Sequence, residues 1–230
     1  MSFIPDKNLF LVTSAIKSLN TRFWSHEQRF KQTVLTVESI RKRVPEAIIV
    51  LADASLTSLT EEEHKQLQPY LNAFMDMNRV PDVNKFSSSG QQAMAESVLL
   101  FNALHLLKQQ PWFKDVKRIF KISGRSILEP EFKLSDYDNL FGKYVFKKRI
   151  PTWMPQVTHG ATDLLITRLF SFCPSLVDNY LEVLQYNLPL FNFMDFEHAH
   201  FVNIPKEYLV EFDKIHCYGW LAGNGQVENY

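Results

Sequence analysis

Two short apolar runs decide the fold: residues 9–14 have the sequence LFLVTS, and residues 47–53 have the sequence AIIVLAD. Both are rich in β-branched residues and end in polar ones, which is typical of strands buried on both faces. Between them, Ser25 precedes a segment that Pro45 closes. Its apolar residues recur every three or four positions, at Phe30, Val34, Val37, Ile40 and Val44. This spacing predicts a helix, and strand, helix and strand together form a βαβ unit with parallel strands.

The rest of the chain continues this alternation. We expect further strands at residues 73–77, 118–123, 144–147 and 164–172, and helices at 91–108, from Ser175 onward and at 196–204. No internal repeat or low-complexity linker interrupts the pattern. The sequence therefore predicts an α/β fold over residues 1–230, as a single Rossmann-like domain with a mostly parallel central sheet flanked by helices.

Composition excludes several classes of protein. The 230 residues include 46% hydrophobic ones, and 25 Lys and Arg balance 25 Asp and Glu. A chain with no net charge offers no field for a polyanion, so we expect no nucleic acid as a partner. Cys173 and Cys217 stand far apart and are interpreted as buried thiols of a reducing compartment. No signal peptide or apolar stretch of about 20 residues is present, which predicts a cytoplasmic protein without a transmembrane segment.

Polar residues follow three of the predicted strands, as Thr13-Ser14, Asp53-Ala54-Ser55 and Ser123-Gly124-Arg125. Open α/β sheets bind ligands beyond the carboxyl ends of their strands, so these residues are candidates for a binding site. Each group can equally serve as turn and cap residues. The Gly-Arg pair suits a phosphate, because glycine lets the backbone approach a ligand and arginine presents a planar fork of donors.

Alternatives to that phosphate site remain at this stage. Arg125 could instead form an exposed ion pair with Glu129 or Glu131. Three basic residues near the end of the first strand, Arg22, Arg29 and Lys31, are further candidates for binding phosphate, although any helix near water carries such charges. Asp136 and Asp138 could hold a divalent ion, although the acidic first turn of a helix is favoured. The dinucleotide-binding, Walker, serine-hydrolase and HExxH motifs are absent, which argues against those enzyme classes.

The densest group of titratable residues is Asp195, Glu197, His198 and His200, which stand among phenylalanines. On a helix, Asp195 and His198 share one face, and Glu197 lies near Phe193 and Phe201. Burial among aromatic rings would raise the pKa of Glu197, which suits a general base. A surface helix with an acidic first turn and two solvated histidines is an equal alternative.

In order along the chain, the segments LFLVTSAI, EQRFKQTVLTVESIRKRVP, AIIVLADAS, SGQQAMAESVLLFNAL, RIFKISGRSIL and DFEHAHF, with a Gly-rich tail, form a recognisable combination. It resembles nucleotide-diphospho-sugar glycosyltransferases of the GT-A fold. More narrowly, it is similar to small viral and bacterial sugar transferases in which Ser-Gly-Arg stands where the family usually has Asp-x-Asp. The resemblance implies a nucleotide-sugar donor as co-substrate and a glycan or glycoconjugate acceptor.

The resemblance also implies roles for individual residues. Thr13 and Ser14 would line the donor pocket, Asp53 would meet the base or ribose, and Ser123, Gly124 and Arg125 would occupy the metal and diphosphate position. Glu197 would be the catalytic base, with Asp195 as the next candidate. Family members use Mn or Mg held by Asp-x-Asp. Here either His198 and His216 hold the metal, or Arg125 and Lys121 supply the positive charge directly.

Two functions of different class follow. The first is a glycosyltransferase, and the second is a non-catalytic α/β binding or assembly module that has lost the metal site. The absence of Asp-x-Asp at residues 123–125, where Ser-Gly-Arg stands instead, is the feature that favours the second.

Overall fold

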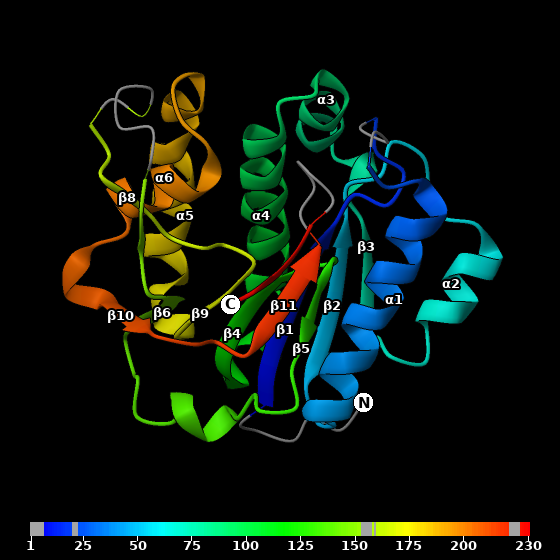
Figure 1. Ribbon diagram of the computed structural model, residues 1–230. Coiled ribbons are helices and arrows are strands. Elements are labelled where there is room, and N and C mark those ends of the chain that lie inside the picture. The colour runs from blue at the N-terminus through cyan, green and yellow to red at the C-terminus, as the bar shows by residue number, and fades with distance from the viewer. Residues whose placement is uncertain (1–6, 20–22, 153–157, 159, 221–225) are drawn as a thin grey trace.

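The structure is a computed structural model that describes residues 7–19, 23–152, 158, 160–220 and 226–230 (Figure 1). Its centre is a seven-stranded sheet in the order β10-β6-β9-β4-β1-β2-β3. These strands are β1 (Lys7–Ser14), β2 (Ile48–Asp53), β3 (Ala73–Asp76), β4 (Val116–Ser123), β6 (Tyr144–Lys147), β9 (Leu169–Phe172) and β10 (Leu209–Phe212). Neighbouring strands are parallel except where β9 pairs with β4 and β6. The predicted α/β fold with a mostly parallel central sheet is confirmed.

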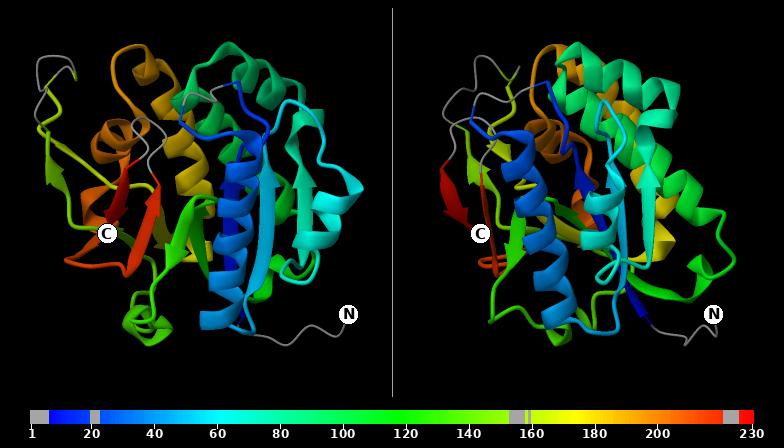
Figure 2. Two further views of the ribbon diagram at one scale, coloured as in Figure 1. Left: turned by 45° about the vertical axis from the view of Figure 1, so that its right-hand side comes forward. Right: turned by 90° about the vertical axis from the view of Figure 1, so that its right-hand side faces the viewer.

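Helices cover both faces of this sheet (Figure 2). On one face lie α1 (His26–Arg43) and α2 (Glu61–Leu67); on the other lie α4 (Gln92–Lys108), α5 (Val177–Asn187) and α6 (Phe196–Asn203), with α3 (Pro81–Ser89) beside α4. The residues of β1 are continuously apolar because the strand contacts a hydrophobic core on each face of the sheet. Leu9 and Leu11 belong to the core under α4, whereas Phe10 and Val12 belong to the core under α1.

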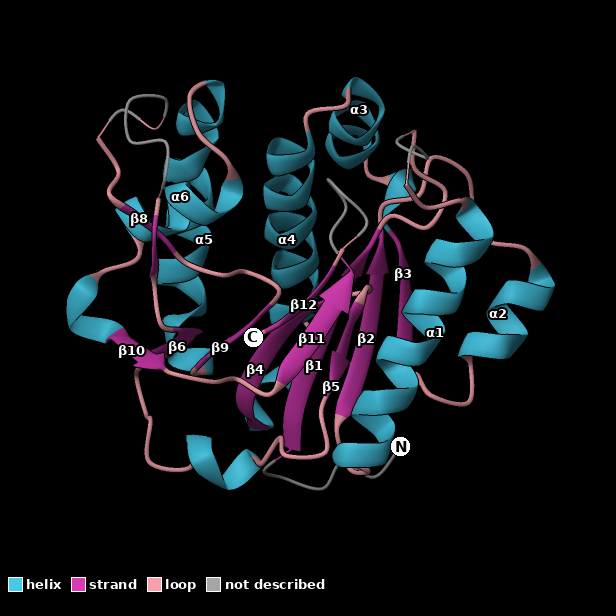
Figure 3. Ribbon diagram, viewed as in Figure 1, coloured by secondary structure: helices cyan, strands magenta, loops and turns pink. Residues whose placement is uncertain are grey.

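A second, antiparallel sheet lies beside α1 and has the order β12-β11-β5 (Figure 3). It consists of β5 (Ser126–Leu128), β11 (Cys217–Trp220) and β12 (Val227–Asn229). A separate hairpin joins β7 (Ile150–Pro151) to β8 (Asp163–Leu164). None of the described helices combines the length and the apolar character that a membrane span requires.

One strand prediction was wrong. Residues 164–172 belong to two separate strands, β8 and β9, because backbone groups between these strands form hydrogen bonds with other parts of the chain. The Leu165 amide donates to the Glu197 carbonyl (3.2 Å), and the Arg168 carbonyl accepts from the Ser123 amide (2.8 Å). These bonds bend the chain between β8 and β9 and bring the intervening residues beside β4.

Two smaller predictions also need correction. Strand β3 ends at Asp76, and Met77 begins a 3-10 turn. Cys217 is buried as predicted, but Cys173 is only partly buried. Asp136 lies in the first turn of a 3-10 helix (Leu134–Tyr137), as the favoured alternative predicts, and Asp138 pairs with Lys117 (2.9 Å).

Candidate functional site

A cavity of about 250 Å³ opens at the carboxyl ends of β1, β2 and β4. The order of the strands reverses between β1 and β4, since β2 and β3 extend the sheet on one side of β1 and β4 on the other. Such a switch point is where open α/β sheets bind ligands. The lining residues are Thr13, Ser14, Ala15, Ile16, Ser18, Leu19, Arg29, Thr33, Ala54, Leu56, Phe86, Ser87, Gly90, Gln92, Ala95, Glu96, Leu99, Ser123, Gly124 and Arg125.

Gly124 brings the end of β4 into close contact with β1 and α1. Its amide donates to the Thr13 carbonyl (2.7 Å), and its carbonyl accepts from the Thr33 hydroxyl (3.1 Å). A Cβ at this position would lie 2.9 Å from Ser14 Cβ and 3.2 Å from Thr13 O. Only glycine fits there, so the approach of the two strand ends fixes where the following Arg125 begins.

Asp53 organises the loop after β1 from behind the cavity. Its buried carboxylate accepts hydrogen bonds from the Ser14 hydroxyl (2.5 Å) and from the amides of Ile16 (3.1 Å) and Ser55 (3.2 Å). Burial raises the pKa of Asp53, and the bonds from Ser14 and Ser55 oppose that rise. Thr13 and Ser14 line the cavity, whereas Asp53 holds them in place.

Helix α1 contributes a polar stripe to the same edge. Ser25 caps the helix and accepts a hydrogen bond from the Gln28 amide (3.2 Å), which begins the helix as the sequence predicts. Arg29 and Thr33 are buried and line the cavity. They lie one turn apart on the helix. Arg22 lies outside the described residues.

Arg125 extends from the end of β4 into the cavity wall. Its Nε atom is buried and has no hydrogen-bond partner among the described residues. Burial lowers the pKa of this guanidinium to about 9, with contributions from the charges of Arg168 and Arg29, while Glu96 acts in the opposite direction. Arg125 therefore stays cationic at neutral pH. Glu129 and Glu131, the alternative partners considered from the sequence, form no ion pair with it among the described residues.

Lys121 lies behind the cavity and supports Glu96. Its buried amine donates to a Glu96 carboxylate oxygen and to the Thr167 carbonyl (2.9 Å). Burial alone would raise the pKa of Glu96, but Lys121, Arg168 and Arg125 outweigh it, and the pKa is lowered. Glu96, in the second turn of α4, is thus an ionised carboxylate at the cavity wall.

Glu197 belongs to the same charged group but is not part of the cavity lining. The Thr167 hydroxyl donates to its carboxylate (2.8 Å). Burial raises the pKa of Glu197, Arg168 opposes that rise, and Asp195 and Glu96 add to it. The rise in the pKa of Glu197 that the sequence predicts is confirmed. The expected surroundings differ in part, because Phe193 is 51% exposed and the charged neighbours of Glu197 are an arginine and two carboxylates.

The other residues of α6 have structural partners. Asp195 caps the helix and accepts hydrogen bonds from the His198 amide (3.0 Å) and ring Nδ1 (2.7 Å), so the two share a face as expected. The other ring nitrogen of His198 contacts the Thr152 hydroxyl (2.9 Å). His200 is fully buried against the Tyr180 hydroxyl (2.9 Å), and burial lowers its pKa to about 4. It is a neutral core histidine rather than a solvated one.

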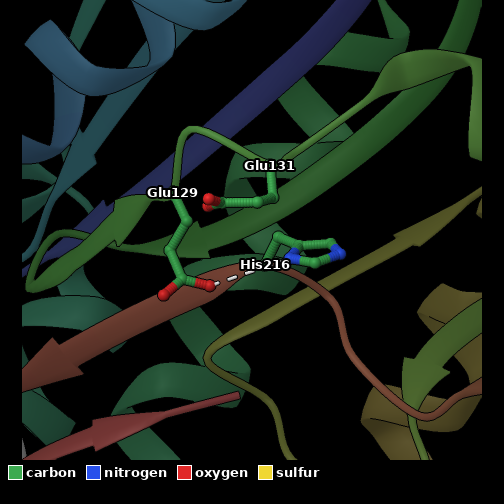
Figure 4. A group of neighbouring side chains, drawn as sticks. All are labelled: Glu129, Glu131 and His216. Carbon is green, nitrogen blue, oxygen red and sulfur yellow. Dashed lines mark ion pairs between the residues drawn. The ribbon is translucent and has the colours of Figure 1, made fainter.

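The two histidines considered as metal ligands do not share a ligand group. In the described part of the chain, the cluster of potential ligands is Glu129, Glu131 and His216, shown in Figure 4. His216 Nδ1 lies 3.9 Å from a Glu129 oxygen. Glu129 follows β5 and His216 precedes β11, at the ends of these strands opposite to Arg125. His198 is engaged by Asp195 and Thr152 instead.

Sequence reasoning missed Arg168 and the role of Glu96. The predicted strand over residues 164–172 includes Arg168 and gives it no role in the site. For Glu96, the resemblance implies only that residues 90–96 open a helix flanking the sugar site, and not the pairing with Lys121. A signal for the cavity was present in α1, where buried Arg29, Thr33 and Thr36 recur at spacings of four and three residues. Polar residues on the inward face of a helix indicate a site rather than core.

No family profile matches the chain, and no curated protein matches it by sequence. Solved structures do match by fold. Mouse xyloside xylosyltransferase 1, in its apo form, has a TM-score of 0.54 at 11% identity, over 90% of this chain and 85% of that one. Core-mannan synthase A (CmsA/Ktr4) from Aspergillus fumigatus, in its Mn/GDP form, has a TM-score of 0.53 at 10% identity, over 93% of this chain and 75% of that one.

The galactosyltransferase LgtC, in complex with donor and acceptor sugar analogues, has a TM-score of 0.54 at 9% identity, over 88% of this chain and 72% of that one. At such identities the likeness concerns the fold. The chain therefore has the fold expected from the resemblance, that of GT-A glycosyltransferases.

Proposed function

We propose that this protein is a glycosyltransferase that moves a sugar from a nucleotide-diphosphate donor to a hydroxyl of a glycan or glycoconjugate. The observation that carries the proposal is Arg125, a half-buried cation at the wall of a cavity located at the switch point of the sheet, whose buried Nε atom has no hydrogen-bond partner among the described residues. A buried N–H without a partner costs stability, and a phosphate oxygen would satisfy it. The fold shared with three sugar transferases agrees with this chemistry.

The two kinds of wall in the cavity suit the two ends of such a donor. Ile16, Leu56 and Phe86 provide apolar surface for a nucleobase. Thr13 and Ser14 offer polar groups for a ribose, with Asp53 holding their loop. The cationic end of the cavity would receive the diphosphate.

Glu197 is the proposed general base. In the transfer step, the acceptor oxygen forms a bond to the anomeric carbon as the bond from that carbon to the diphosphate breaks. The electron pair of the broken bond stays on the diphosphate oxygen, and the acceptor proton moves to Glu197. A carboxylate with a raised pKa suits this role because its proton affinity lies closer to neutral pH. Asp195 is the second candidate, although it caps α6.

Thermal unfolding with ribonucleoside diphosphates and nucleotide sugars tests the proposal. A ligand at about 100 times its Kd stabilises the folded state by about 2.7 kcal/mol, which is a rise of roughly 5 to 10 °C in Tm for a domain of this size. Turnover is then followed as release of nucleoside diphosphate. Absence of any shift across the donors would refute the proposal. A shift without turnover for any acceptor would favour the non-catalytic binding module.

A further inference from the structure

The ligands available at the end of β4 do not suit a divalent cation. Mn and Mg prefer several oxygen ligands, with carboxylates prominent among them. At this position the chain offers a serine hydroxyl, a glycine and a guanidinium. Glu96 is the carboxylate in the described cavity lining, and it is already paired with Lys121. The residues present therefore do not fit a metal such as the Mn in the solved structure of core-mannan synthase A.

The charges around the cavity also favour an anion. Arg125 lies within electrostatic range of Arg29 and Arg168, and each of these cations lowers its pKa. Glu96 is the carboxylate that acts on Arg125 in the opposite direction, and Lys121 already compensates its charge. A cation entering here would meet like charges, whereas a diphosphate would relieve their mutual repulsion.

Two unused hydrogen-bonding groups lie along the cavity. Within the part of the chain that the structure describes, the buried Nε atom of Arg125, after β4, has no hydrogen-bond partner, and neither does the buried hydroxyl oxygen of Ser87, on α3. Both residues line the cavity. Buried polar groups are nearly always paired, so two unpaired groups in one cavity indicate a ligand that supplies the missing acceptors.

We propose that Arg125, assisted by the charge of Arg29, takes the place of the metal ion, so that the donor diphosphate binds without a divalent cation. This inference rests on the proposed function. Gly124 fixes the start of the arginine backbone against β1. The resemblance implies that this strand end corresponds to the Asp-x-Asp position of the family.

Isothermal titration of the full chain with individual ribonucleoside diphosphates tests the inference, once in excess EDTA and once in MnCl2. We expect Kd values that agree within about twofold between the two conditions. Binding that EDTA abolishes and Mn restores would overturn the inference while leaving the proposed function intact. Absence of binding in both conditions would instead reject the proposed function, and the inference with it.

Substitutions of Arg125 distinguish its contribution to diphosphate binding from any contribution to folding. Arg125→Ala should weaken binding about 10- to 100-fold in EDTA, the range for a lost charge-assisted hydrogen bond. Arg125→Lys keeps the charge without the fork and should retain part of the affinity. Arg79→Ala is the matched control, because Arg79 is an exposed arginine paired with Asp76 outside the cavity lining. Wild-type affinity of a folded Arg125→Ala protein would overturn the inference.

Discussion

Glu197→Gln is the substitution that tests the chemistry most directly. It keeps the shape of the side chain and an oxygen that can accept the Thr167 hydrogen bond, but it removes the basic carboxylate. We expect turnover to fall about a hundredfold or more, equivalent to about 2.7 kcal/mol in the transition state, the usual contribution of a general base. Donor binding should stay within a few fold, since Glu197 is not part of the cavity lining.

The raised pKa of Glu197 fixes the sign of two further effects. The base must be ionised to act, so wild-type turnover should fall as the pH drops through a pKa higher than that of an ordinary glutamate. For folding, a raised pKa means that the folded state binds the proton more tightly, so ionised Glu197 destabilises the protein above its unfolded pKa. Gln removes that cost, and the Tm of the variant at pH 7 should equal or exceed that of the wild type.

The assay is release of nucleoside diphosphate with the donor found by the binding screen. Glu182→Gln is the matched control, because Glu182 is an exposed glutamate on α5. Near wild-type turnover by Glu197→Gln would refute the assignment. It would move the base to Asp195 or favour a retaining mechanism, which needs no such base.

Three further substitutions or conditions probe the support of the site. Lys121→Met leaves Glu96 without its buried partner. Because 34% of the Glu96 side chain is exposed, we expect the free energy of unfolding, measured in urea, to fall by about 3 kcal/mol, the lower end of the range for a broken buried ion pair. Gly124→Ala places a Cβ 2.9 Å from Ser14 Cβ and should cost about 1–3 kcal/mol by overpacking, measured as a lower Tm; an unchanged Tm would contradict the close approach. The pKa of His200 in the folded protein is about 4, so between pH 6.5 and 4 the unfolded state binds more protons than the folded state. As the pH is lowered from 6.5 to 4, the free energy of unfolding should therefore fall by about 3 kcal/mol, as measured by urea titrations at each pH.

The fold was predictable because its signals are local. The runs at 9–14 and 47–53 and the spaced apolar residues of α1 each specify an element within a few residues, and the right-handed crossover rule joins them into a sheet. The polar strand ends then indicate the edge where the cavity lies. Thr13, Ser14 and Arg125 line it as expected, and their role in donor binding stays a prediction.

The rest of the site depends on contacts between distant parts of the chain. Lys121 was expected at the phosphates, but its amine is turned to Glu96 and to the Thr167 carbonyl. Arg168 enters the charged group only because the backbone bends between β8 and β9, and that bend requires hydrogen bonds to α6 and β4. Sequence periodicity carries no information on such pairings, since each partner is more than 20 residues away along the chain.

Gly219, the glycine of β11, has a consequence for the order in which the sheet folds and the proposed binding site forms. A Cβ on Gly219 would lie 2.7 Å from the Arg125 carbonyl, and the amide of Trp220 donates to that same carbonyl (3.0 Å). The backbone of Arg125 is therefore held by a strand that follows it much later in the chain, at Cys217–Trp220. Because chains emerge from the ribosome amino end first, β1, β2 and β4 can pair while the nascent protein still lacks this strand. A ribosome-bound chain halted before residue 217 should hold the sheet and yet fail to retain a nucleoside diphosphate.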